Sequence, residues 1–209
     1  GSSVVKFKKL DRSVEVRGLA EKTVESDQAI WTLDYSISSE QLADLNSKVS
    51  TLQTQAMQFI TAEGFPAESV QKSPVTISDK LAQEYGEAKG PRFIARGSIT
   101  VSSNKVKETT AASQKTDELL KKGIAISASR ISYYFTDLNS IKPAMLEEAT
   151  INARQAAEGF ANSSGAYVGG IRKANQGLFS IGSPLSEYEA TSSIQKKVRV
   201  VTQVEFYLE

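Results

Sequence analysis

Two adjoining segments set the architecture: QAIWTLDYSIS at residues 28–38 and SEQLADLNSKVSTLQTQAMQFITAE at residues 39–63. In the first segment every second residue from Ala29 to Ile37 is apolar, which predicts a half-buried strand. In the second segment apolar residues recur at alternating spacings of three and four, which predicts a long amphipathic helix packed on a sheet. The buried face of this helix is predicted to comprise Leu42, Leu45, Val49, Leu52, Ala56 and Phe59.

The same two periods recur on both sides of this strand and helix. Strands are predicted at 13–19, 70–77, 92–102, 124–135, 167–181 and 194–208, and helices at 104–122 and 140–164. The order is ββαββαβαββ, in which residues 27–136 read βαββαβ, the ferredoxin-like arrangement. We therefore expect an α+β protein: an antiparallel sheet with a ferredoxin-like βαββαβ portion, followed by an additional helix and two C-terminal strands.

The helix predicted at 140–164 has an apolar face made largely of small residues. Its inward positions are Leu146, Ala149, Ala153, Ala156 or Ala157, and Phe160. Small side chains let a helix approach its sheet closely, so we interpret this face as a packing surface. In the strand that follows, the pair Gly169-Gly170 indicates a β-bulge or a close backbone approach.

One domain is expected over residues 13–209, with a subdivision near residue 139 as an alternative. The chain opens Gly1-Ser2-Ser3 without a methionine, so we expect residues 1–12 to be a cloning remnant and a linker. A secretion signal or a membrane anchor would then have been removed upstream. No window approaches the roughly 18 consecutive apolar residues that a membrane-spanning helix needs.

The composition excludes several classes of chemistry. The 209 residues carry a formal net charge of +1 and include no cysteine and no histidine. Thiol nucleophiles, disulfides, imidazole bases and Cys/His zinc sites are therefore excluded. The near-neutral charge gives no reason to expect nucleic-acid binding, because duplex-binding proteins usually carry a basic patch. Short basic runs, such as Lys196, Lys197 and Arg199 at the start of the last strand, are expected on solvated surfaces.

The remaining titratable residues form no recognisable catalytic pattern. Glu147 and Glu148 are adjacent, so on a helix their side chains point about 100° apart, which is poor geometry for a paired-carboxylate site. Ser113 and Lys115 are two residues apart and cannot face each other on a helix. We therefore predict no catalytic residue, no metal and no cofactor.

Several separated motifs together resemble one family. EATINARQAAE at 148–158 and VGGI at 168–171 are similar to the signature of the SIMPL-domain family, and VEVRG at 14–18 with DQAIW at 27–31 is similar to its opening strands. The periplasmic immunogenic proteins of Gram-negative bacteria belong to this family. FTDLN at 135–139, KPAM at 142–145 and ANQG at 174–177 resemble a subgroup with a predicted N-terminal signal or membrane anchor.

This resemblance implies a cell-envelope location, which composition alone does not indicate. Members of the family are described as envelope or stress-associated proteins without an established catalytic reaction, and some resemble ring-forming oligomers. The resemblance therefore implies no active site. The long loop at 79–91 departs from the family pattern, so no particular oligomer geometry is carried over to this chain.

Our first hypothesis is a non-enzymatic envelope protein, stress-related as the resemblance implies, that acts through self-assembly or by binding a protein partner. Contact with the membrane is expected only through the removed N-terminal segment. Exposed strand edges and the loops 79–91 and 182–193 would make the contacts. The candidate contact residues are Tyr85, Arg154, Glu158 and Tyr188. Arg154 and Glu158 are four apart, so they either form a surface ion pair or leave Arg154 to bind a partner.

Two alternatives come from other functional classes. A carboxylate-dependent hydrolase of envelope glycans or peptides requires two acidic side chains about 5 to 9.5 Å apart in one cleft. A small-ligand carrier requires a closed, largely apolar pocket of about 300 Å³ or more.

Overall fold

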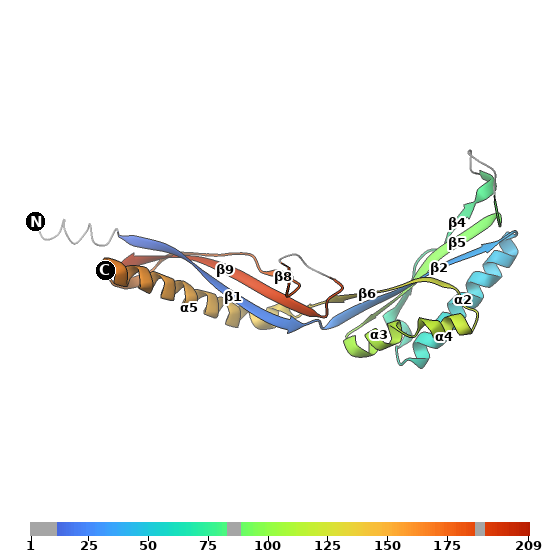
Figure 1. Cartoon of the computed structure of the whole chain (residues 1–209), viewed down its shortest axis with the longest axis horizontal. Helices are drawn as coiled ribbons and strands as arrows, with labels where there is room; N and C mark the ends of the chain where they lie inside the picture. The colour runs from blue at the N-terminus through green and yellow to red at the C-terminus, as the bar shows by residue number, and fades with distance from the viewer. Residues whose placement is uncertain (1–11, 83–88, 187–190) are drawn as a thin grey trace, which may run out of the picture. The chain divides into compact units, whose positions relative to one another are not determined.

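The chain folds into two compact units, which are described separately. The computed structural model describes residues 12–82, 89–186 and 191–209. One unit, the central unit, is Ser26–Tyr134; the other, the terminal unit, combines the described residues up to Glu25 with Phe135–Glu209 (Figure 1). The chain therefore crosses between the units after Glu25 and after Tyr134.

The central unit confirms the ferredoxin-like portion. Its elements are β2 (Gln28–Ser39), α2 (Leu42–Ala62), β3 (Val70–Lys72), β4 (Thr76–Asp79), β5 (Phe93–Ser103), α3 (Val106–Ser113), α4 (Thr116–Lys121) and β6 (Ile126–Tyr134), with single 3₁₀ turns at Ala67–Ser69 and Lys80–Ala82. The antiparallel sheet has the order β3-β5-β2-β6, and β4 also pairs with β5. The strand predicted at 70–77 is thus two short edge strands on either side of Pro74, which cannot donate to a ladder.

The core of the central unit follows the predicted alternation of β2. Trp31, Leu33 and Tyr35 are buried, and the Trp31 ring packs edge-on against Phe59 of α2 with centroids 6.2 Å apart. Five of the six predicted inward residues of α2 are buried, but Leu42 is 52% exposed. Leu42 is the first residue of the helix, and helical side chains point towards the N-terminus. The Leu42 side chain therefore extends past the end of the helix.

The single helix predicted at 104–122 is two helices, α3 and α4, separated by Gln114 and Lys115. Three hydroxyls in and near the end of α3 bond helix carbonyls: Thr109 to Lys105, Thr110 to Val106 and Ser113 to Thr110. Such bonds slightly destabilise helices and often bend them. The predicted stop at Gly123 is confirmed, since this glycine has a φ of +80°.

The terminal unit has a single helix laid on an antiparallel sheet. Its elements are β1 (Ser13–Glu25), α5 (Leu138–Ser164), β7 (Val168–Gln176), β8 (Ser180–Gly182) and β9 (Gln195–Leu208). The strand order is β1-β9-β7, and β8 pairs with β9 beyond β7. Even-numbered residues of β9 from Lys196 to Leu208 are buried, whereas the odd-numbered ones turn to the opposite, outer face. Register shifts at Gly169-Gly170 confirm the predicted bulge.

Helix α5 touches β1 at Gly18. A Cβ atom on Gly18 would lie 1.8 Å from the carbonyl oxygen of Ala149 and 2.6 Å from the amide nitrogen of Ala153. Ala149, Ala153 and Ala157 are fully buried, as the small apolar face predicted. The prediction that Phe160 faces inward is wrong, because its side chain is 53% exposed, whereas Met145 and Ala161 are buried. The buried stripe advances in steps of four from Met145 to Ala161, so Phe160 lies to one side of it.

We expect Gly18→Ala to lower the free energy of unfolding by about 2 kcal/mol or more, because the new methyl group must push the α5 backbone away from β1. The matched control is Gly159→Ala, where a Cβ meets no heavy atom within 4 Å. In the helix this change should stabilise by about 0.5 to 1 kcal/mol. Denaturant unfolding of both variants measures the difference, and equal stabilities would refute the tight contact.

Candidate functional site

Of the four predicted contact residues, the structure describes two. Tyr85 and Tyr188 lie outside the described residues. Arg154 and Glu158 form an ion pair on α5, with 3.4 Å between Nε and Oε1, and both side chains are about half exposed. The Arg154 guanidinium also lies 5.5 Å from the centre of the Phe206 ring. An exposed pair of this kind contributes about 0.3 kcal/mol.

The two outer edges of the terminal sheet differ in how they are covered. In an antiparallel pair of strands, one residue turns its N–H and C=O groups towards the partner strand and the next residue turns both groups to the opposite side. Because Leu208 donates to the carbonyl of Arg12, the odd-numbered residues of β1 turn their backbone groups to its outer edge. There the Nδ2 of Asn152 on α5 donates to the carbonyl of Leu19 over 2.7 Å. Helix α5 thus covers the β1 edge near its middle.

Strand β7 is more open than β1. Residues 170–176 are exposed on both faces, because α5 lies over β1 and β9 (Figure 1). The amide of Gly177 donates to the carbonyl of Val201 over 2.8 Å. Gly177, and every second residue before it in β7, therefore turns its backbone groups towards β9. Ala174 and Gln176 therefore turn their backbone N–H and C=O groups to the outer edge.

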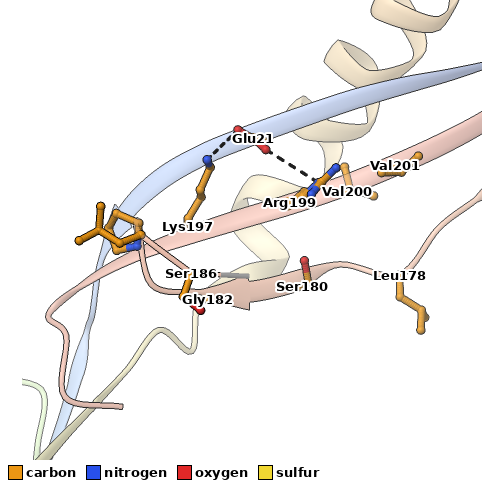
Figure 2. Close-up of a pocket in the computed structure, with 11 residues that line it drawn as sticks. Glu21, Leu178, Ser180, Gly182, Ser186, Lys197, Arg199, Val200 and Val201 are labelled. Carbon is orange, nitrogen blue, oxygen red and sulfur yellow. Dashed lines mark ion pairs between the residues drawn. The ribbon is translucent and has the colours of Figure 1, made fainter. Parts of the chain in front are cut away.

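A second feature is a hollow of about 590 Å³ on the outer face of the terminal sheet, opposite α5 (Figure 2). It is bounded by β1, β8, β9 and the turn that follows β8. The lining residues are Glu21, Leu178, Ser180, Gly182, Pro184, Leu185, Ser186, Lys197, Arg199, Val200 and Val201. The volume is in the range of small-molecule sites in proteins.

The charged part of the hollow comes from two paired strands. Glu21 of β1 lies directly opposite Arg199 of β9 in the register. Lys197 lies two residues before Arg199 and therefore on the same face of β9. The Nζ of Lys197 lies 3.0 Å from Oε2 of Glu21, and the Nε of Arg199 lies 3.8 Å from Oε1 (Figure 2). The described lining thus carries two cations and one carboxylate, a formal charge of +1.

The apolar part of the hollow depends on a bulge in the edge strand. Gly177 pairs with Val201 and Ser180 with Arg199, so two residues, Leu178 and Phe179, oppose Val200 alone. Phe179 packs into the cluster beneath α5, and Leu178 is left 94% exposed. A bulge commonly redirects a side chain in this way. Leu185, on the turn after β8, is 99% exposed.

The sequence did not identify this hollow. Lys197 and Arg199 stand two residues apart on a strand, which places them on one face, but nothing local marks Glu21 as their partner. The expectation of a solvated surface holds only in part, because Lys196 is fully buried on the α5 side of β9.

The positions of the acidic side chains bear on metal binding and on paired-acid chemistry. Within the described parts of the chain, no group of three or more Asp, Glu, His or Cys side chains could hold a metal ion. The described lining of the hollow includes one carboxylate, Glu21, whereas a carboxylate-dependent hydrolase uses two. Among the helices of those same parts, none is long and apolar enough to cross a membrane.

Comparison with known proteins gives one match. A sequence model of the SIMPL family, described as a protein of unknown function (DUF541), matches residues 14–206. A search of curated proteins found no match.

The loop predicted at 79–91 is closed at its base by an ion pair. Arg92 donates from Nε and Nη2 to the two carboxylate oxygens of Asp79, each over 3.1 Å. These bonds, with a further one from the amide of Leu81, hold the pKa of Asp79 below its ordinary value. The pair's stabilisation is complete above the unfolded pKa of about 3.9 and is lost as the pH falls through the folded pKa.

Arg92→Gln should therefore raise the pKa of Asp79 towards its ordinary value, as measured by carboxyl carbon NMR during an acid titration. The pKa of Asp44, which is lowered chiefly by the hydroxyl of Ser39 and also by Lys48, serves as the internal control and should not move. An unchanged Asp79 pKa would show that the pair does not form in solution.

Proposed function

Because the chain belongs to the SIMPL family, we propose that it acts without catalysis, as a cell-envelope protein that assembles with copies of itself or binds a protein partner. The observation that carries this proposal is the open outer edge of β7. An extended segment of a partner adds to such an edge by main-chain hydrogen bonding, and the exposed side chains of the strand supply selectivity.

The difference in cover between the edges of β1 and β7 supports β7 as the edge to which a partner adds. On β1 the amide of Asn152 already occupies the carbonyl of Leu19, which is a common way to protect an edge from unwanted pairing. On β7 the bulges near Gly170 and Arg172 limit regular pairing to the segment from Lys173 to Gln176. The proposed contact is therefore a short strand addition at this segment.

Apolar side chains near the same edge extend the proposed contact. Ile171 is half exposed, and Tyr167, just before β7, is 77% exposed. Arg172 is engaged by Glu205 of β9 over 3.3 Å, so this cation is held within its own sheet. A partner chain that continues past Lys173 would then cover Ile171 and Tyr167 without having to displace Arg172.

The envelope location is part of the proposal and rests on the resemblance of 135–145 and 174–177 to the anchored or secreted subgroup. Fractionation of cells that make the full-length protein tests it. Recovery with the periplasm or the inner membrane supports the proposal, and recovery in the cytoplasm contradicts it.

Ala174→Pro tests the edge directly. The N–H of Ala174 faces outward, so proline removes a donor that an incoming strand needs while no bond to β9 is lost. We expect self-association or partner binding to weaken at least about tenfold, because the proline ring also obstructs the incoming strand. Sedimentation velocity over a range of concentrations measures self-association, and co-purification from envelope extracts measures partner binding.

The matched control is Ala67→Pro, at the exposed first residue of a 3₁₀ turn in the central unit. Proline is accepted at such a position, and the preceding Pro66 already has an extended ψ of 156°. Both variants should keep the melting temperature of the parent. Equal association by both variants would contradict a role for the β7 edge, as would a strictly monomeric parent that captures no partner.

A further inference from the structure

The hollow on the outer face of the terminal sheet combines two properties. It joins a positive ion cluster to leucines that are almost completely exposed. Covering these side chains with an apolar group is favourable, because it removes their surface from water. We propose that this hollow binds a small amphipathic anion, a single carboxylate or phosphate group joined to an apolar chain.

The charges select an anion. Glu21 lies between Lys197 and Arg199 and offsets one of the two positive charges. The three side chains are about two-fifths exposed or less, which makes their charges accessible to a ligand but less screened than on an open surface. A ligand anion at Lys197 would receive a charge-assisted hydrogen bond, the stronger kind.

The backbone of the sheet holds the apolar side of the hollow in place. The bulge that turns Leu178 outward requires Gly177, because a Cβ there would lie 2.3 Å from the carbonyl oxygen of Val201. Phe179 is anchored beneath α5, and the ammonium of Lys142 lies 5.4 Å from the centre of its ring. Leu178 is therefore held outward by both neighbours and is not a side chain on a loose tip.

The hollow differs from the closed, largely apolar pocket that a small-ligand carrier requires. It is an open site, so the ligand would remain partly in water, and its apolar chain would be covered on one side by Leu178, Pro184 and Leu185. A volume of about 590 Å³ accommodates an acyl chain of medium length. A fatty acid and the apolar C-terminal residue of a peptide share this chemistry.

Titration of the whole chain with octanoate, followed by backbone and side-chain NMR, tests the inference. Signals of Leu178, Leu185 and Lys197 should shift with saturation. Acetate, which lacks the chain, and octanol, which lacks the charge, should each bind at least about tenfold more weakly. N-acetyl-leucine distinguishes the source: stronger binding than octanoate indicates a peptide terminus, and weaker binding indicates a fatty acid.

Two pairs of variants complete the experiment. Lys197→Gln should weaken octanoate binding several-fold, whereas Lys48→Gln, which breaks a comparable 3.1 Å pair with Asp44 on α2, should not. Leu178→Ser should also weaken binding, whereas Leu120→Ser, at another highly exposed leucine, should not.

The inference is overturned if neither octanoate nor N-acetyl-leucine shifts these signals, or if Lys197→Gln binds as the parent does. It is also overturned if acetate or octanol binds as well as octanoate, since charge or apolar surface alone would then suffice. These results are independent of the Ala174→Pro experiment, because that experiment probes association at the β7 edge.

Discussion

The terminal unit depends on one close contact, that of α5 with β1 at Gly18. The absence of a side chain at Gly18 allows the backbone of Ala149 and Ala153 to approach the strand directly. Because α5 is held over β1 and β9, Asn152 reaches the outer edge of β1 and bonds the Leu19 carbonyl. The same placement leaves residues 170–176 of β7 without cover on either face. The close approach at Gly18 thus places Asn152 at the β1 edge and leaves the edge of β7 open.

The consequence for function is a division of the sheet into a covered and an accessible part. One face packs under α5 and supplies rigidity through buried residues such as Val200, Val204 and Phe206. The accessible part comprises the β7 edge and the outer face, where the hollow lies. Binding at either place requires no rearrangement of the core, so the proposed activities fit a scaffold that works through contact.

The sequence predicted the regular elements well, because their signals are local. Alternation in β2, the three-and-four spacing in α2 and the alanines of α5 each report burial directly from neighbouring positions. The errors occur where the local signal is incomplete. Phe160 fits the helical period only approximately, and α3 ends at Ser113 although the apolar pattern continues, where the hydroxyls of Thr109, Thr110 and Ser113 bond backbone carbonyls.

The hollow and the two edges could not be predicted, since each depends on contacts between distant segments. Glu21 meets Arg199 only because β1 pairs with β9 in one particular register. Leu178 is exposed because a bulge places Phe179 inward, and the sequence around it shows only a glycine. The predicted ion pair of Arg154 with Glu158 did form, because it needs nothing beyond one helical turn.

We propose that partners add to the outer edge of β7. Hydrogen exchange of the full-length protein, measured residue by residue in its associated and dissociated states, is the direct test. We expect the amides of Ala174 and Gln176 to gain protection on association while those on the outer edge of β1 do not. Protection gained along β1, or no change along β7, would contradict it.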